Sequence, residues 1–254
     1  MEDYIKFLND FLSQNSSSTA KFYDDLLNGK KTRAIVGAEN RYKIESPWQL
    51  EMVEKYFDPI FSQVLKSNSN LLDYGCGNGF FTKRLSGICN TVTGVDISEE
   101  FIKHALIDKP KNSYFSVINP HSKVIKSKID FDSCLMVDVV HHLESPNSDF
   151  EFLSKYFKIG DPIIIFEPNI KNPAIFFMHL FDKNERGLLR FMKRSSYRKL
   201  LDAHIMLDSI EYNGILIGPA NRFTNKIVSI LNFKYFKHFL GWLNPKIVIF
   251  GKFK

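Results

Sequence analysis

Three glycines that alternate with other residues directly after an apolar segment place the strongest constraint on the fold. Residues 71–80 read Leu-Leu-Asp-Tyr-Gly-Cys-Gly-Asn-Gly-Phe, and apolar residues at helical spacing follow at Phe81 and Leu85. Glycine tolerates positive φ angles and leaves the backbone bare, so a ligand can approach the main chain closely. The start of the next helix offers N–H groups that suit a carboxylate or a phosphate. The pattern predicts a β-strand, a ligand-binding turn and a helix.

Three kinds of nucleotide loop compete for these residues. The dinucleotide fingerprint G-x-G-x-x-G requires a glycine where this chain has Phe80, and the Gly-Lys-Ser/Thr of a Walker loop is absent. The complete match is apolar-apolar-Asp-x-Gly-x-Gly-x-Gly, in which the chain resembles motif I of the class I S-adenosylmethionine-dependent methyltransferases. The resemblance implies S-adenosylmethionine as the cofactor. The loop residues that it assigns to cofactor binding are Asp73, Gly75, Cys76, Gly77 and Gly79.

A second acidic residue follows about twenty residues after the glycines, in the segment Thr-Gly-Val-Asp-Ile-Ser at 93–98. A carboxylate at the tip of the second strand can accept both hydroxyl groups of an adenosine ribose. The resembled family uses the residue at Asp96 in this way, and we expect Ile97 beside it to contact the cofactor. Many relatives also bind the adenine amino group through an Asp after the third strand. Here Asn119 offers an amide oxygen for that bond, or is a plain turn residue before Pro120.

From residue 70 onward, short apolar segments alternate with segments of helical spacing. This alternation is typical of right-handed βαβ units, whose parallel sheet is covered by helices on both faces. The predicted strands are 71–74, 92–97, 114–118, 133–137, 162–166, 207–212 and 246–253. The predicted helices between the first five strands lie near 79–87, 99–107 and 147–158. The fold class is therefore α/β. The resemblance implies a doubly wound, Rossmann-like sheet of seven strands, mostly parallel, with an antiparallel last strand.

Helical spacing before the first strand predicts a separate N-terminal layer. Residues 1–69 form this helical cap, with helices expected at 3–13, 16–27 and 48–65. Residues 70–254 form the S-adenosylmethionine-binding methyltransferase domain, with a helical insert at about 170–200. The cap helices would close over the cofactor and exclude water. We expect Tyr23 to contact the substrate and Arg41 to pair with the methionine carboxylate, a surface position being the alternative for Arg41.

Four side chains follow strands four and five, where open α/β sheets bind their ligands. Asp138 is expected to contact the cofactor, and either His141 or His142 is the candidate catalytic base, because histidine titrates closest to neutrality. Alternatively, one histidine packs under the cofactor and the other caps the next helix. Glu167 is expected to bind the substrate or to have a structural role. A hydroxyl acceptor requires such a base, whereas an amine acceptor only has to be neutral.

Charge is distributed unevenly along the 254 residues, whose net charge is +6. Residues 1–170 carry 19 basic and 23 acidic side chains, whereas residues 171–254 carry 15 basic and 5 acidic side chains. Such asymmetry indicates an anionic partner near the C-terminal third, or a solvated basic face. Two stretches that mix apolar and basic residues, 176–199 and 233–242, suit a cover over a small substrate, an anionic membrane surface, or helices packed on the sheet.

The sequence therefore predicts a methyltransferase that modifies a small-molecule acceptor, which is lipid- or glycan-linked in one alternative, with O-methylation favoured. A nucleic-acid substrate is disfavoured, because residues 138–141 lack the Asp/Asn/Ser-Pro-Pro-Tyr/Phe loop of the nucleic-acid amino-methyltransferases. The residues also leave open a non-catalytic S-adenosylmethionine-binding protein and a dehydrogenase.

Three cysteines without a CxxC pair indicate no zinc site and no disulfide framework. An acidic N-terminus without a long apolar segment predicts a cytoplasmic protein, peripheral to the membrane in one alternative. The sequence leaves the oligomeric state open.

Overall fold

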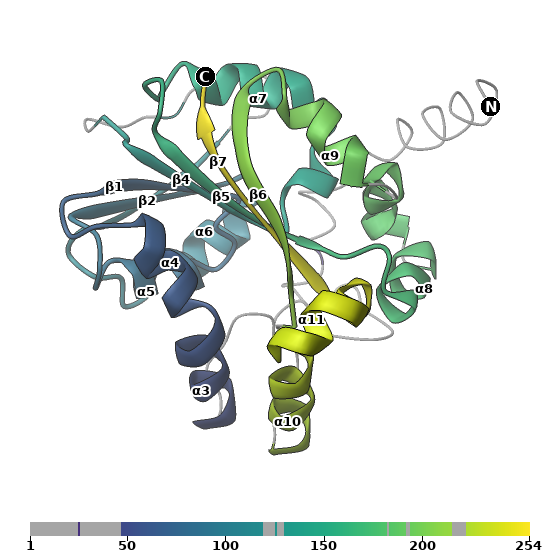
Figure 1. Ribbon diagram of the computed structural model, residues 1–254. Helices are drawn as coiled ribbons and strands as arrows, with labels where there is room; N and C mark the ends of the chain where they lie inside the picture. Colours follow the sequence, from purple (N-terminus) through teal and green to yellow (C-terminus); the bar gives the residue numbers. More distant parts are fainter. Residues whose placement is uncertain are drawn as a thin grey trace.

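A seven-stranded sheet runs through the centre of the molecule (Figure 1). The computed structural model describes residues 25, 47–118, 125, 130–181, 183–191, 194–214 and 222–254. The strands are β1 (Asn70–Tyr74), β2 (Thr91–Asp96), β3 (Ser113–Val117), β4 (Ser133–Val137), β5 (Pro162–Pro168), β6 (Ile205–Asn213) and β7 (Lys246–Phe253). Their order is β3-β2-β1-β4-β5-β7-β6. Strand β7 is antiparallel to both β5 and β6, whereas the pairs among β1 to β5 are parallel, which confirms the predicted sheet.

Helices cover both faces of this sheet. The α-helices of the first half are α3 (Pro47–Tyr56), α4 (Asp58–Val64), α5 (Phe80–Leu85), α6 (Glu99–Ala105) and α7 (Pro146–Ser154). Those of the second half are α8 (Pro173–Phe181), α9 (Arg194–Leu201), α10 (Arg222–Leu231) and α11 (Lys234–Leu240). Three 3₁₀ segments complete the described chain: η3 (Val140–His142), η4 (Lys183–Phe191) and η5 (Gly241–Leu243). None of the described helices is long and apolar enough to cross a bilayer.

Two hydrophobic clusters occupy the two faces, because successive side chains of a buried strand point in opposite directions. Leu71 and Leu135 lie in one cluster with α3, α4 and α5, whereas Leu72 and Met136 lie in the other with α7, η4 and α9. Both clusters therefore use the same strands, which explains why the strands read as continuous apolar runs.

The helical segment before the first strand differs from the expected one in shape and in position. It consists of two helices, with Asp58-Pro59 starting the second. The rings of Phe57 and Phe61 pack against Phe81 and Phe166, with centroids 5.0 to 5.8 Å apart. Helices α3 and α4 therefore form part of the core layer on the sheet and not a lid over a ligand. The two cap helices expected before residue 47 lie outside the described residues, apart from the single helical residue Asp25.

Candidate cofactor and acceptor pocket

The three loop glycines all have positive φ angles, of 80°, 54° and 79° for Gly75, Gly77 and Gly79. A Cβ atom on Gly75 would lie 2.3 Å from Val139 Cγ2, and one on Gly79 would lie 2.7 Å from the ring of Phe115. A Cβ on Gly77 would meet nothing within 4 Å. The outer glycines therefore let the loop pack against its neighbours, whereas Gly77 presents bare backbone to open space.

The tip of β2 is bonded directly to this loop. The backbone N–H of Gly77 donates to Oδ2 of Asp96 at 2.9 Å, and that of Ser98 donates to Oδ1 at 2.9 Å. The N–H groups of Gly75 and Cys76 both donate to the carbonyl of Val95. The carboxylate of Asp96 is thus oriented by two backbone donors beside the bare main chain of Gly77.

Asp73 lies beneath the loop at the carboxyl end of β1. Thr82 Oγ1 donates a 2.6 Å hydrogen bond to its Oδ2. Burial raises the pKa of Asp73 to about 7, the Thr82 hydrogen bond opposes this rise, and the charge of Asp96 adds to it. Burial also raises the pKa of the neighbouring Cys76 thiol, which holds it in its neutral, unreactive form.

One cavity joins most of the residues that the sequence singles out. It holds about 1080 Å³ of empty space, its open mouth included. It is lined by the sequence-predicted residues Asp73, Gly75, Cys76, Gly77, Asp96, Ile97, Asp138 and His142. The remaining lining is Tyr74, Asn78, Phe80, Phe81, Phe101, Ile118, Val137, Val139 and Leu143. Gly79 does not line the cavity and starts helix α5.

This cavity fits the cofactor that the motif implies. The bare backbone of Gly77 leaves room that any Cβ would fill. Asp73 and Asp96 place two carboxyl groups beside that room, as a ligand with ammonium and sulfonium charges requires. The apolar walls at Ile97, Phe101 and Ile118 suit the flat faces of a purine.

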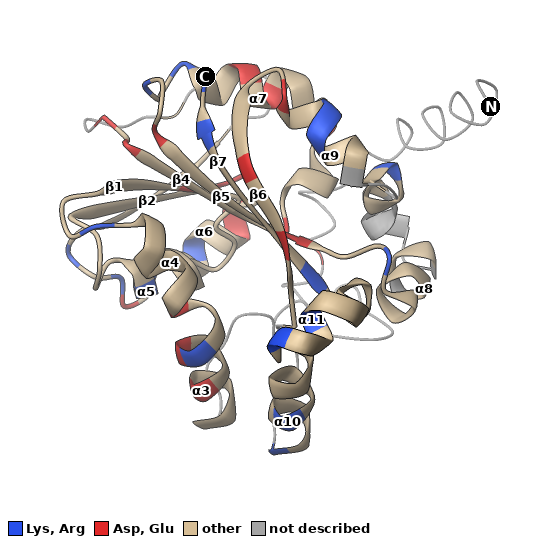
Figure 2. Ribbon diagram, in the orientation of Figure 1, with Lys and Arg blue, Asp and Glu red and all other residues tan. Residues whose placement is uncertain are grey.

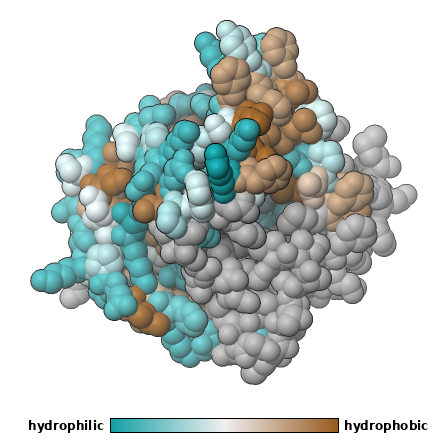
Figure 3. All heavy atoms as spheres, turned by 90° about the horizontal axis from the view of Figure 1, so that it is seen from below, coloured by the Kyte–Doolittle hydropathy of each residue, from teal (hydrophilic) through white to brown (hydrophobic). Residues whose placement is uncertain are grey.

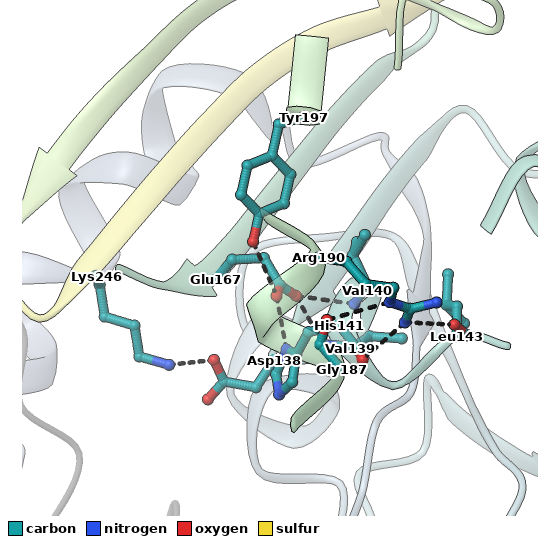
Figure 4. Close-up of polar contacts among 10 residues, drawn as sticks. All are labelled: Asp138, Val139, Val140, His141, Leu143, Glu167, Gly187, Arg190, Tyr197 and Lys246. Carbon is teal, nitrogen blue, oxygen red and sulfur yellow. Dashed lines mark hydrogen bonds and ion pairs between the residues drawn. The ribbon is translucent and has the colours of Figure 1, made fainter. Parts of the chain in front are cut away.

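The loop that follows β4 forms the opposite wall of the cavity. Asp138 has a φ of 57°, an uncommon conformation for a residue with a side chain. Its Oδ1 accepts from Nζ of Lys246, and both side chains are about 10% exposed (Figure 4). Lys246 begins β7, so this ion pair joins the β4 loop to the antiparallel strand on the far side of β5.

Glu167 occupies a different place from the one expected of a substrate ligand. Its side chain is 0% exposed and does not line the cavity. Oε1 accepts from the backbone N–H groups of Val139 and Val140 at 2.9 and 2.8 Å. Oε2 lies 2.6 Å from Nδ1 of His141 and accepts from the Tyr197 hydroxyl at 3.5 Å (Figure 4). These contacts favour the structural alternative, in which Glu167 fixes the β4 loop from behind.

The two adjacent histidines have different environments. His141 is 1% exposed, with Nδ1 on Glu167 and its ring 5.9 Å from that of His179. His142 lines the cavity, and its ring lies 4.0 Å from that of His141. The pair therefore consists of a buried, anchored histidine and a second one at the cavity wall.

The helical insert also holds this loop, which the sequence did not reveal. Arg190 on η4 donates to the carbonyl of His141 at 3.0 Å and to that of Leu143 at 2.7 Å, one on each side of His142. A Cβ on Gly187 would lie 1.9 Å from the His141 carbonyl oxygen. Burial lowers the pKa of Arg190, and the nearby charge of Glu167 opposes this. No local pattern marks Arg190 in the sequence, because its partners lie almost fifty residues away.

Three predicted contacts fall on residues whose structure is not described. Tyr23, Arg41 and Asn119 all lie outside the described residues. Within the described part of the chain, no group of three or more His, Cys, Asp or Glu side chains is placed to hold a metal ion.

Known proteins resemble the chain in this same region. Residues 72–160 match the family model described as "Methyltransferase domain". A ubiquinone biosynthesis O-methyltransferase of Idiomarina loihiensis is 24% identical over 190 residues, which cover 70% of this chain and 75% of that protein.

Solved structures share the fold at lower identity. A SAM-dependent methyltransferase from Aquifex aeolicus superposes with a TM-score of 0.57 at 16% identity, covering 83% of this chain and 95% of that one. The structure of the N-methyltransferase NodS from Bradyrhizobium japonicum, in complex with S-adenosyl-L-homocysteine, superposes with a TM-score of 0.56 at 12% identity. The superposition covers 91% of this chain and 97% of that one. The glycine loop, the acidic strand tip, the seven-stranded sheet and the matched methyltransferase domain together place this chain among the class I S-adenosylmethionine-dependent methyltransferases.

Proposed function

We propose that this enzyme transfers a methyl group to a hydroxyl oxygen of an apolar small-molecule acceptor, and that His142 removes the hydroxyl proton. One observation carries the proposal: His142 lines the same cavity as the glycine loop and Asp96, whereas His141 is buried behind it on Glu167. The two histidines thereby receive separate roles, which the sequence left open.

The positions of the lining residues support a set of cofactor-binding roles. We assign the ribose hydroxyls to Asp96 and the cationic amino-acid end to the region of Asp73 and Gly77. Ile97 and Cys76 line the same space, and Asp138 closes it from the β4 side. Contacts of Asn119 with the adenine, of Arg41 with the carboxylate and of Tyr23 with the acceptor stay predictions.

Positioning is the main task of the protein, since bound S-adenosylmethionine itself supplies an electrophilic methyl group. Holding the acceptor oxygen behind that methyl can lower the barrier by about 7–11 kcal/mol. A positioned base contributes a further ~10²–10⁴-fold. Glu167, His141 and Arg190 act as positioning residues, because they fix the backbone on both sides of His142.

The lining of the cavity supports an apolar, aromatic acceptor. Phe80, Phe81 and Leu143 contribute apolar surface to the cavity that His142 lines. The relative from Idiomarina loihiensis, matched over 70% of this chain, is named as an O-methyltransferase. An amine acceptor is the second candidate, because the structure of NodS, named as an N-methyltransferase, shares the fold.

Matched pairs of acceptors distinguish these two candidates. The purified enzyme is incubated with labelled S-adenosylmethionine and a panel of alkyl-substituted phenols and catechols, each paired with the corresponding aniline. Methylation of the phenols above the anilines is expected. Turnover of the anilines alone would contradict O-methylation, and turnover of neither would contradict the acceptor class.

A histidine substitution tests the proposed base. His142→Gln should lower kcat on the phenols by about 10²–10⁴-fold with little change in cofactor affinity. The wild-type rate should fall at acid pH, because a protonated histidine cannot accept the hydroxyl proton, and this limb should vanish in the variant. The control is His104→Gln, because His104 is exposed on α6, and its kcat and pH profile should match those of the wild type. An unchanged pH profile in His142→Gln would remove His142 from the reaction.

A further inference from the structure

Residues 222–243, which precede β7, contain two short helices, α10 and α11, and the 3₁₀ segment η5, on the lower side of the molecule in Figure 1. Asn225 on α10 donates to the Trp48 carbonyl at 3.0 Å and to Glu51 Oε2 at 3.1 Å, which attaches α10 to α3. Within α10, α11 and η5 only Val228 and Gly241 are buried. Most of the side chains of this segment therefore lie outside the hydrophobic core.

Large apolar side chains are concentrated on this segment. Seven of the fifteen exposed large hydrophobic residues of the described chain lie within residues 222–243. They are Phe223, Ile230, Phe233, Tyr235, Phe239, Leu240 and Trp242. Tyr235 and Phe239, one helical turn apart, are 66% and 73% exposed. Seen from below, hydrophobic side chains gather on the described surface among hydrophilic ones (Figure 3). Concentrations of this kind mark binding surfaces on soluble proteins.

The charges on the segment all have one sign. Residues 222–243 contain Arg222, Lys226, Lys234 and Lys237 and no acidic residue. Figure 2 accordingly shows blue and no red on α10 and α11. Exposed aromatic residues with a basic flank are typical of helices that lie in the interface of an anionic bilayer. Four of the fifteen basic side chains of residues 171–254 therefore lie on this segment.

This surface is joined to the cavity through the start of β7. Asn169, directly after β5, donates to the carbonyls of Trp242 and Asn244 at 2.9 and 2.7 Å. Two residues further on, Lys246 contacts Asp138 at the cavity wall. The surface that α11 and η5 form therefore lies at the same carboxyl edge of the sheet as the proposed acceptor site.

We propose that α10, α11 and η5 form a docking face for an anionic lipid bilayer, here called the aromatic–basic face, which brings the cavity close to acceptors dissolved in the membrane. Its meaning for catalysis rests on the proposed apolar acceptor, whereas the docking itself is independent of turnover. The aromatic rings enter the headgroup region, and the exposed Arg222, Lys226 and Lys234 meet the lipid phosphates.

Cosedimentation with vesicles tests the docking without substrate. Full-length enzyme with S-adenosylhomocysteine is mixed with vesicles of phosphatidylcholine alone or of phosphatidylcholine with the anionic lipid phosphatidylglycerol. We expect binding to the anionic vesicles that weakens steeply with salt, and little binding to phosphatidylcholine. No binding to anionic vesicles at low salt overturns the proposal.

Surface variants separate the aromatic from the basic contribution. Tyr235→Ser with Phe239→Ser should weaken vesicle binding at least about tenfold. Lys226→Gln with Lys234→Gln should weaken it by about fivefold for each lysine, the effect of about 1 kcal/mol per basic residue. The control is Ile159→Ser, because Ile159 is 84% exposed before β5, at the amino end of the strands.

Cofactor binding, measured by calorimetry, should stay at the wild-type value in all three variants. This keeps a failure of docking distinct from a failure of the methyltransferase assignment. Equal losses in Ile159→Ser and in the aromatic variant would overturn the proposal. A dimeric wild type in the absence of vesicles, detected by analytical ultracentrifugation, would also overturn it if the aromatic variant were monomeric. The face would then bind a second copy of the chain.

Discussion

At the scale of single residues, the buried carboxyl of Asp73 links folding to pH. Burial raises its pKa to about 7 from the ordinary 3.8 that the unfolded chain retains. Because the folded pKa is the higher one, the stabilising contribution of the protonated group is complete below about pH 4. It is lost as the pH rises through about 7.

Asp73→Asn should remove this pH dependence. The unfolding free energy of the wild-type apoenzyme should fall by about 1–4 kcal/mol more than that of the variant between pH 4 and pH 8. Urea denaturation at several pH values measures the difference. Asp130→Asn alters an exposed carboxylate and should keep the wild-type dependence. If Asp73→Asn keeps it as well, Asp73 is ionised throughout and the account of its environment is wrong.

Glu167 contacts three consecutive residues of the β4 loop, Val139, Val140 and His141. Glu167→Gln replaces an acceptor of four hydrogen bonds by an amide whose NH₂ must face donors. We expect a loss of about 2–4 kcal/mol in unfolding free energy and a lower kcat. Tyr197→Phe removes only the 3.5 Å bond and should cost less than about 1 kcal/mol. Denaturation of both variants measures this, and equal losses would contradict the ranking.

At the scale of elements, the insert after β5 and the β4 loop behave as one unit. Gly187→Ala places a methyl group within 1.9 Å of the His141 carbonyl oxygen, so η4 must move away and Arg190 must lose its geometry. We expect kcat to fall by roughly tenfold or more, because sub-ångström to ångström displacements of catalytic groups have such effects. The affinity for S-adenosylhomocysteine should change less than twofold.

The comparison variant for the insert is Gly87→Ala. A Cβ there would touch only the Arg84 carbonyl, at an ordinary 3.5 Å, and should leave kcat unchanged. Steady-state kinetics with calorimetric binding resolve the two parameters. Parallel loss of cofactor affinity in Gly187→Ala would mean that the insert supports the whole cavity and not the His142 loop.

The same elements show what the sequence can and cannot predict. All seven strands were predictable. The inner ones are mostly buried on both faces and leave apolar runs such as 162–166. The edge strands β3 and β6 are only partly buried. Helix α10 was not predicted, since its apolar stripe at Phe223, Ile227 and Ile230 is mostly exposed and lies in a polar setting. The expected single helix at 48–65 is divided at Asp58-Pro59, where a proline starts a new helix.

The candidate site was predictable where it is local. The glycine loop and Asp96 are set by one βαβ unit, and the structure brings them together in one cavity. The roles of Glu167 and Arg190 depend on contacts between segments 25 to 50 residues apart, for which the sequence holds no periodic signal. Sequence spacing therefore located the glycine-loop side of the cavity better than the contacts that hold the β4 loop.

At the scale of the whole molecule, the two halves of the sheet have separate tasks. Strands β1 and β2, with the loops after them, hold most of the residues that we propose bind the cofactor. Strands β5, β7 and β6 carry the insert and the aromatic–basic face. The β4 loop contacts both halves, through Val139 against Gly75 and through Asp138 against Lys246. This division predicts that cofactor binding and membrane docking can be removed one at a time.

S-adenosylhomocysteine at a hundred times its Kd should stabilise the wild type by about 2.7 kcal/mol, or about 5–10 °C in Tm. Asp96→Ala should abolish most of that shift, because the ribose loses its carboxylate, and should leave vesicle binding intact. Tyr235→Ser with Phe239→Ser should do the reverse. The ligand-induced change in Tm is compared instead of Tm itself, since Asp96 also accepts from Gly77 and its loss lowers basal stability. If either variant impairs both properties, the halves are coupled through the β4 loop, and the cavity and the docking face act as a single site.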